Sequence, residues 1–200
     1  MDDIETRRLF MEDHEWERTS ASWKSLKPHR DFNQFRETDE TTIEYHLRLQ
    51  KTFDIPFDVV DQWLYPHYYN INTTNNYGWI DYNLVSFRLI TLPFKQLATV
   101  NVVADYKPYV EGRSSAQAFS EFRCQKEDLE YWRTNLTWRI PPIIIDAESL
   151  HPIPNHAEVH SPYQIVEGHS RLGYLIATSR CGLVLGNSQH SVYVMRVLKK

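Results

Sequence analysis

The chain has 200 residues, of which 42% are hydrophobic and 14% aromatic; this supplies enough apolar surface for a core and excludes an intrinsically disordered chain. The formal net charge of −4 disfavours a nucleic-acid partner. No stretch approaches the roughly 18 apolar residues of a membrane span, and the amino terminus does not read as a signal peptide, so we expect no membrane partner. Two cysteines, Cys124 and Cys181, fit a cytoplasmic protein with reduced thiols.

The first segment of the chain predicts a helix. Residues 3–26 are charged and amphipathic, and Leu9, Trp16 and Trp23 recur every seven residues, which places them on one helical face. Surface helices usually carry such an apolar stripe. We therefore favour packing of this helix on its own chain over a partner-binding role.

Four further segments are predicted before residue 93. They are a short helix over 41–52, a helix that starts at Asp54 and ends at Pro66, a polar loop over 70–78, and one bulged strand or two strands over 79–92. The aromatic run at residues 63–70 favours core or interface packing over base stacking, because no Lys or Arg is interleaved with it.

The middle of the chain predicts a strand and then helical segments. Residues 98–106 have the composition of a strand. Ser114 or Ser115 is expected to cap a helix that reaches Phe122, and residues 126–134 are expected to form a further helical turn or two.

The last third predicts a different architecture. A short buried strand at residues 143–145 is followed by a loop with three prolines, a strand at 163–168, a helix at 169–180 and a final strand from His190. The two prolines directly ahead of the first strand suit the start of a strand. This order of elements predicts an α+β fold with a mixed sheet.

The junction of the second strand and the helix carries the candidate site. It reads Glu167-Gly168-His169-Ser170-Arg171. The first N–H groups of a helix lack intrahelical partners and carry partial positive charge, which suits phosphate. Gly168 would let the backbone approach a ligand, while Ser170 and Arg171 could donate to phosphate oxygens.

The same junction holds two candidate catalytic groups. His169 could donate a hydrogen bond or move a proton. Glu167 could bind Mg²⁺ or a ribose hydroxyl. An ordinary turn is the alternative interpretation, with a serine cap and with Arg171 paired to Glu167, because short motifs of this kind give many false matches.

The wider context of this motif resembles the ParB/sulfiredoxin-like superfamily. The resemblance covers residues 138–198, where a strand leads to Glu-Gly-His-Ser-Arg and then to a helix. It implies a nucleotide or phosphate pocket formed by Gly168, His169, Ser170 and Arg171. The implied cofactor is ATP, ADP or CTP with Mg²⁺. The implied chemistry is phosphoryl transfer or nucleotide hydrolysis, in which His169 would act as acid or base and Glu167 would be the second catalytic residue.

The motif departs from several members of that superfamily. His169 stands where the sulfinic-acid reductases have Cys, which argues against their chemistry. The nearest local match is the Asp-Gly-His-Thr-Arg form of the free-serine kinase, with Glu167 for Asp and Ser170 for Thr. Asp146 and Glu148 are the nearest carboxylates after the first strand, and hence the candidates for a general base.

The two parts of the chain are expected to differ in role. Residues 1–135 would be a helical and β elaboration with a partner-binding face, and residues 136–200 the superfamily core, together in one compact unit. The alternative function is a non-catalytic bacterial immunity protein or antitoxin, whose acidic surface would meet a basic toxin. We expect no metal site at the histidine-rich loop 151–160, because its spacing is irregular.

Overall fold

The computed structural model describes residues 17–29 and 39–199, and the chain divides into two compact units. The first consists of Met1–Phe87, Ser149–Val159 and Val197–Lys200, and the second of Arg88–Glu148 and His160–Arg196. The boundary expected between residues 135 and 136 therefore falls inside the second unit, whose sheet takes in a strand from the middle of the chain.

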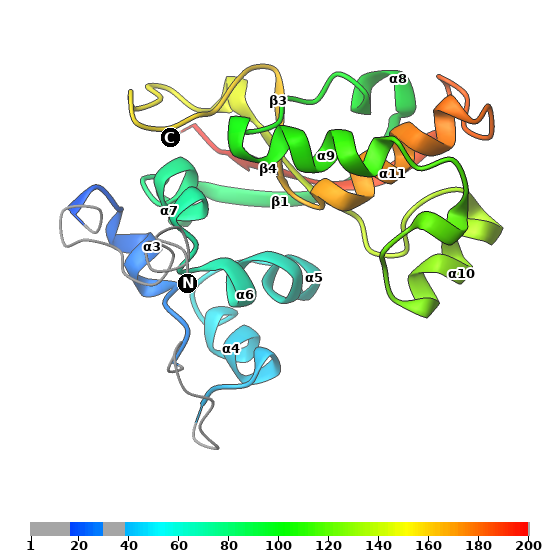
Figure 1. Ribbon diagram of the computed structural model, residues 1–200. Helices are drawn as coiled ribbons and strands as arrows, with labels where there is room; N and C mark the ends of the chain where they lie inside the picture. Colours follow the sequence, from blue (N-terminus) through cyan, green and yellow to red (C-terminus); the bar gives the residue numbers. More distant parts are fainter. Residues whose placement is uncertain (1–16, 30–38, 200) are drawn as a thin grey trace, which may run out of the picture. The chain divides into compact units, whose positions relative to one another are not determined.

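The first unit is built from short helices (Figure 1). Those described are α3 (Ala21–Ser25), α4 (Thr42–Leu49), α5 (Phe57–Val59), the π-helix η1 (Val60–Leu64), α6 (Tyr65–His67), α7 (Ile71–Tyr77) and the 3₁₀ helix η2 (Tyr82–Leu84). The side chains of Ser20, Thr41 and Asn70 cap α3, α4 and α7 by accepting hydrogen bonds from backbone N–H groups of the first helical turn.

Three predictions for this unit need correction. The helix over 3–26 is broken at residues 18–20, where Ser20 caps a new helix; Leu9 and Trp16 lie outside the described residues. The loop predicted over 70–78 is wrong, because Asn70 accepts from Thr73 N–H and starts α7. The helix ends at His67, one residue after Pro66, because α5, the π-helix η1 and α6 form one continuous helical segment that includes the proline.

Aromatic side chains form the core of the first unit. Trp23 is fully buried, stacks on Tyr68 with ring centroids 4.9 Å apart, and lies 6.4 Å from Trp63 and 5.4 Å from Tyr82. The aromatic run at residues 63–70 thus contributes to a core, one of the two roles predicted for it.

The second unit combines helices with a sheet. Its described elements are β1 (Val85–Pro93, which begins in the first unit), α8 (Phe94–Leu97), η3 (Ala104–Tyr106), α9 (Lys107–Ser114), η4 (Phe119–Glu121), α10 (Lys126–Asn135), β2 (Ile143–Asp146), η5 (Ala147–Ser149), β3 (Tyr163–Glu167), α11 (His169–Arg180) and β4 (Gln189–Val197). No described helix is long and apolar enough to cross a membrane.

The sheet of the second unit is mixed, which confirms the predicted α+β class. Its described strands follow the order β1-β4-β2-β3. The interior strand β2 runs parallel to β4, with Ile144 opposite Val194, and antiparallel to β3, with Ile144 opposite Ile165. Pro142 directly precedes β2, and its carbonyl accepts a hydrogen bond of 2.9 Å from Tyr193 N–H. The proline therefore sits where it removes no donor that the strand itself needs.

Two predictions for the middle of the chain are wrong. Residues 98–106 form no strand: Asn101 makes an isolated bridge to Gln164, and Ala104–Tyr106 form the 3₁₀ helix η3. The helix lies before Ser114 rather than after it: α9 starts at Lys107 with a proline in its first turn, a favoured position that was overlooked.

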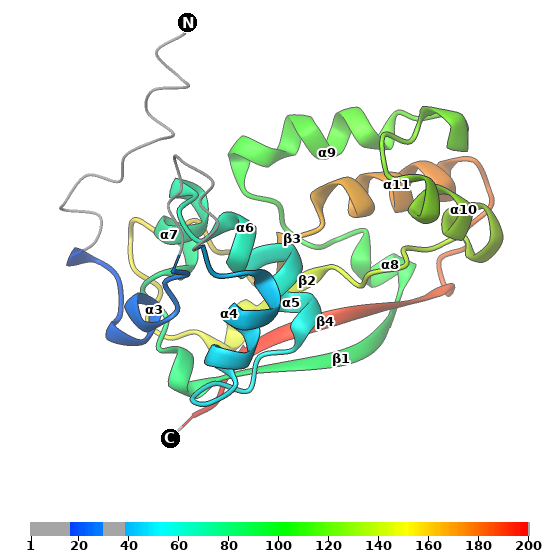
Figure 2. The ribbon, with the colours of Figure 1, turned by 90° about the horizontal axis from the view of Figure 1, so that it is seen from below.

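Helices α9 and α11 pack against each other, and Figure 2 shows α11 between the sheet and α9. Gly173 permits this close approach. A Cβ on Gly173 would lie 2.5 Å from the Cβ of Arg113 and 2.7 Å from the carbonyl oxygen of Val110. The tight contact fixes which α9 side chains stand beside the start of α11.

Candidate functional site

The turn between β3 and α11 has a left-handed conformation, which the sequence analysis did not predict. Gly168 has φ 102° and ψ 27°, a region that favours glycine. The space beside it is filled by the chain itself, since a Cβ at this position would lie 2.5 Å from the Cβ of Pro142 and 3.1 Å from the Arg171 guanidinium. Gly168 therefore serves a close approach within the protein.

Arg171 folds back over this turn. Its Nη1 donates a 2.8 Å hydrogen bond to the carbonyl of Ile140, and its Nη2 lies 3.6 Å from a carboxylate oxygen of Glu167. Burial lowers the pKa of Arg171, an effect that the negative charge of Glu167 partly offsets. The predicted pairing of these two residues is present, and it holds the strand end to the first turn of the helix.

His169 and Ser170 point to the other side of the turn, toward η3 and α9. The ring of His169 is buried, with 8% of the residue exposed, and its centroid lies 4.4 Å from that of Tyr106. The Ser170 hydroxyl is 2.7 Å from the hydroxyl of Tyr109. The five motif residues are thus divided between two environments, with Glu167, Gly168 and Arg171 in one and His169 and Ser170 in the other.

Tyr109 connects the start of α11 to an arginine. Its hydroxyl accepts a 3.3 Å hydrogen bond from Nη2 of Arg113, one turn along α9. Burial raises the pKa of Tyr109, but the hydrogen bonds with Ser170 and Arg113 and the positive charge of Arg113 outweigh it, so the net shift is downward. The phenol is therefore placed in a cationic environment.

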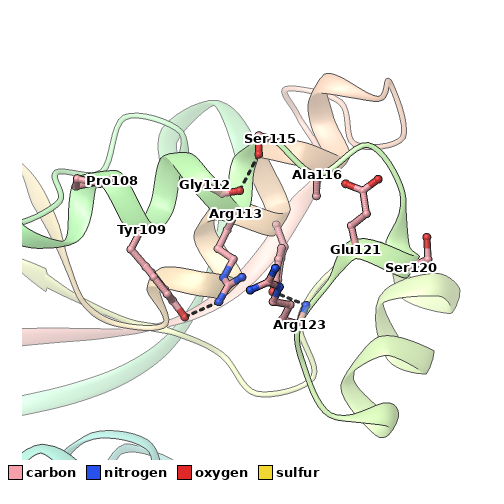
Figure 3. Close-up of a pocket in the computed structure, with 10 residues that line it drawn as sticks. Pro108, Tyr109, Gly112, Arg113, Ser115, Ala116, Ser120, Glu121 and Arg123 are labelled. Carbon is pink, nitrogen blue, oxygen red and sulfur yellow. Dashed lines mark hydrogen bonds between the residues drawn. The ribbon is translucent and has the colours of Figure 1, made fainter.

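A pocket of about 660 Å³ opens beside this chain of contacts (Figure 3). It is lined by α9, by the segment around η4 and by one residue of α11: Pro108, Tyr109, Gly112, Arg113, Ser115, Ala116, Ser120, Glu121, Arg123 and Tyr174. Its volume lies within the range of small-molecule sites, about 300–1,000 Å³.

Two guanidinium groups give this pocket its charge. In Figure 3 the side chain of Arg113 enters from α9 and that of Arg123 from the segment after η4. The lining carboxylate, Glu121, accepts a 3.0 Å hydrogen bond from the backbone N–H of Gln117. Tyr174 holds the wall together, because its hydroxyl accepts from Arg123 N–H at 2.7 Å.

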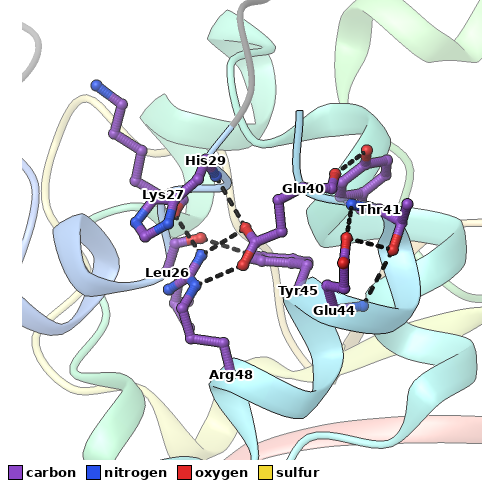
Figure 4. A network of polar contacts seen from close by, with 9 residues as sticks. Leu26, Lys27, His29, Glu40, Thr41, Glu44, Tyr45 and Arg48 are labelled. Atoms are coloured by element: carbon purple, nitrogen blue, oxygen red, sulfur yellow. Dashed lines mark hydrogen bonds and ion pairs between the residues drawn. The ribbon is translucent and has the colours of Figure 1, made fainter. Parts of the chain in front are cut away.

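The first unit has a polar cluster of its own, around Arg48 (Figure 4). Arg48 donates two hydrogen bonds of 2.7 and 2.9 Å to the carboxylate of Glu40 and one of 2.8 Å to the carbonyl of Lys27. Burial raises the pKa of Glu40, but hydrogen bonds from Arg48 and from the His29 amide hold it below its usual value. The donors and acceptors of this cluster satisfy one another, so we assign it a structural role.

Asp146, a candidate general base, takes part in contacts that stabilise the fold. Asp146 is buried and accepts hydrogen bonds from Arg196 at 2.8 Å and from Glu148 N–H at 3.1 Å, which leaves it poorly placed as a general base. Among the described residues, no group of three or more His, Cys, Asp or Glu side chains could hold a metal ion.

The motif-based prediction missed Tyr109, Arg113 and Arg123. The first two are spaced four residues apart and therefore share one face of a helix, a signal that was available once α9 was recognised. Arg123 lies outside regular structure, and no local pattern marks it.

Comparisons of the chain with protein-family models, with curated proteins and with solved structures found no match. The resemblance to the ParB/sulfiredoxin-like superfamily therefore depends on the Glu167–Arg171 motif and on the order of the elements around it.

Proposed function

We propose that the second unit binds a phosphate-bearing small molecule, a nucleotide with Mg²⁺ in the first place, at the start of α11. The observation that carries the proposal is that no side chain of residues 17–29 and 39–199 caps this helix, while the Ser170 hydroxyl stands in its first turn. Backbone N–H groups at a helix start and a nearby hydroxyl are donors that suit phosphate oxygens.

The motif residues would contribute to phosphate binding in different ways. Ser170 would donate to the phosphate, and Gly168 would set the turn. Arg171 would act mainly by holding the turn in place, because its guanidinium already binds the Ile140 carbonyl. His169 would pack beside the ligand rather than enclose it.

The carboxylate of Glu167 would hold the magnesium ion of such a ligand. Its side chain is about a quarter exposed, at 24%, and its 3.6 Å ion pair with Arg171 is longer than a hydrogen bond. Mg²⁺ is commonly bound by one or two carboxylates together with substrate phosphates. The ion would supply charge neutralisation at the phosphates, and Glu167 would position it.

The geometry favours binding over catalysis. Phosphoryl transfer or hydrolysis would require His169 or Glu167 to exchange a proton with the reacting group. Glu167 lies against Arg171, and the His169 ring is buried beside Tyr106. We therefore propose a nucleotide-binding role and assign to His169 only the secondary role of proton donor or acceptor.

We further propose that the second unit is of the ParB/sulfiredoxin-like type. In support, β2, β3, α11 and β4 follow one another in the predicted order, and the motif lies at the junction of β3 and α11. The left-handed Gly168 is what a strand that turns sharply into a helix requires.

Calorimetry with ATP, ADP and CTP, each with Mg²⁺, tests the binding proposal. We expect heat with at least one nucleotide, and about a tenfold loss of affinity in Ser170→Ala, because a hydrogen bond to a charged group contributes about 1.5 kcal/mol or more. Ser179→Ala, in the last turns of the same helix, is the matched control. Absence of heat with all three nucleotides, or unchanged affinity in Ser170→Ala, would overturn the proposal.

A protein partner, as for an immunity protein or antitoxin, is the second candidate function. It is favoured by an apolar surface on the first unit, where Ile43 is 63%, Leu47 57% and Phe57 41% exposed. If a basic toxin binds there, Ile43→Glu with Leu47→Glu should abolish complex formation with it in gel filtration and leave nucleotide binding unchanged.

A further inference from the structure

The pocket beside α9 carries an excess of positive charge. Arg113 and Arg123 are the cations of its lining and Glu121 is the anion. Within residues 17–29 and 39–199, neither arginine forms an ion pair with a carboxylate. Both guanidinium groups would attract an anion that enters this pocket.

The guanidinium of Arg113 is held in a fixed orientation beside the pocket. Its guanidinium carbon lies 4.7 Å from the ring centroid of Tyr109 and 5.9 Å from that of Tyr174, so the two rings hold it in place. Its Nε is buried without a hydrogen-bond partner among the described residues. A guanidinium that is fixed in orientation in this way is prepared to bind an oxyanion.

The rest of the lining suits an organic phosphate. Ser120 adds a hydroxyl group, whereas the Ser115 hydroxyl donates to the Gly112 carbonyl at 2.8 Å. Pro108 and Ala116 add apolar surface. Small-molecule sites typically combine apolar walls with a few polar groups that converge on the ligand. The planar fork of arginine matches the oxygens of phosphate better than a lysine ammonium would.

Tyr109 joins this pocket to the start of α11. It lines the pocket, and its hydroxyl is 2.7 Å from Ser170, the phosphate donor of the proposed function. It also accepts the 3.3 Å hydrogen bond from Arg113. The Tyr109 side chain therefore contacts both the pocket and the start of α11, and a ligand that reaches Ser170 lies next to the pocket.

We propose that the ligand carries at least two phosphoryl groups and that the second one binds in this pocket, between Arg113 and Arg123. The inference rests on the proposed function, which places the first phosphoryl group at Ser170. The two arginines determine specificity, because they provide charge that a ligand with a single phosphoryl group at the start of α11 does not reach.

Binding of inorganic pyrophosphate and inorganic phosphate to the full chain tests this assignment. We expect pyrophosphate to bind at least about tenfold more tightly than phosphate, and Arg123→Gln to remove most of that difference while phosphate affinity stays unchanged. Arg123 is the residue of choice because its side chain is exposed. Arg133→Gln, an exposed position on α10 outside the pocket, is the matched control.

The outcomes separate the two proposals. If Ser170→Ala weakens binding of both anions and Arg123→Gln weakens neither, the phosphate site at α11 stands and the pocket assignment is overturned. If Arg123→Gln weakens binding and Ser170→Ala does not, the pocket stands without the site at α11. If neither anion binds, the site at α11 and the pocket assignment are both overturned. If citrate binds as tightly as pyrophosphate and its binding depends equally on Arg123, the assignment of the ligand as a phosphate compound is overturned.

Discussion

The start of α11 and the neighbouring pocket use arginine in different ways. Arg171 belongs to a recognisable motif, yet its guanidinium binds the Ile140 carbonyl and lies near Glu167. Arg113 and Arg123 belong to no motif, yet both enter a pocket that holds no carboxylate partner for them among the described residues. Motif membership therefore does not decide whether an arginine binds a ligand; what decides it is whether the fold has already satisfied its donors.

Arg48 in the first unit shows the satisfied case most completely. Both of its hydrogen bonds to Glu40 and the one to the Lys27 carbonyl are internal. On this comparison we expect Arg48 and Arg171 to contribute to stability, and we propose that Arg113 and Arg123 contribute to binding. Three substitutions test that division, and the first concerns the turn on which Arg171 depends.

Gly168→Ala should have the largest effect on stability, a loss of about 3 kcal/mol in the free energy of unfolding. The new Cβ would combine a positive φ with a contact of 2.5 Å to the Cβ of Pro142. Gly182→Ala is the matched control, since its φ is 75° but no atom lies within 4 Å of a Cβ there. It should lose only about 1 kcal/mol in urea unfolding. Equal losses at both positions would contradict the tight packing at the α11 turn.

Arg171→Ala should cost about 2 kcal/mol, because a charged donor to the partly buried carbonyl of Ile140 is lost. Arg123→Ala, by contrast, should change the free energy of unfolding by less than about 0.5 kcal/mol, as for other exposed positions. Urea unfolding of both variants, followed by tryptophan fluorescence, measures the difference. Equal destabilisation by the two substitutions would remove the distinction between a structural and a binding arginine.

Glu40→Gln should have a smaller effect, about 1 kcal/mol at neutral pH. The effect should depend on pH, because the pKa of Glu40 is lowered in the folded state. The stabilisation that Glu40 provides is therefore complete above the ordinary glutamate pKa of about 4.3, and it is lost as the pH falls through the lower folded-state value. The variant and the wild type should therefore converge in acid. Glu130→Gln, which removes an exposed pair of 3.9 Å with Lys126, should differ little from wild type at any pH.

Local sequence patterns were sufficient for the elements that surround the motif. The apolar run at Ile143–Ile145, the strand that ends at Glu167 and the helix that starts at His169 were all predicted close to their observed bounds. Each has a continuous pattern of its own, and a left-handed glycine marks the turn between the last two. Around α9 the prediction failed, because the proline in its first turn was not recognised as a start signal.

The sequence by itself determined the mixed α+β class and the position of the motif, because these follow from periodicity and local pattern within a few residues. Only the tertiary structure decided what the arginines do. Arg113, Arg123 and Tyr174 come from separate parts of the chain, and packing of α9 on α11 across Gly173 brings them to one pocket. A guanidinium becomes structural or available according to the partners that the fold places around it, and those partners are distant in sequence.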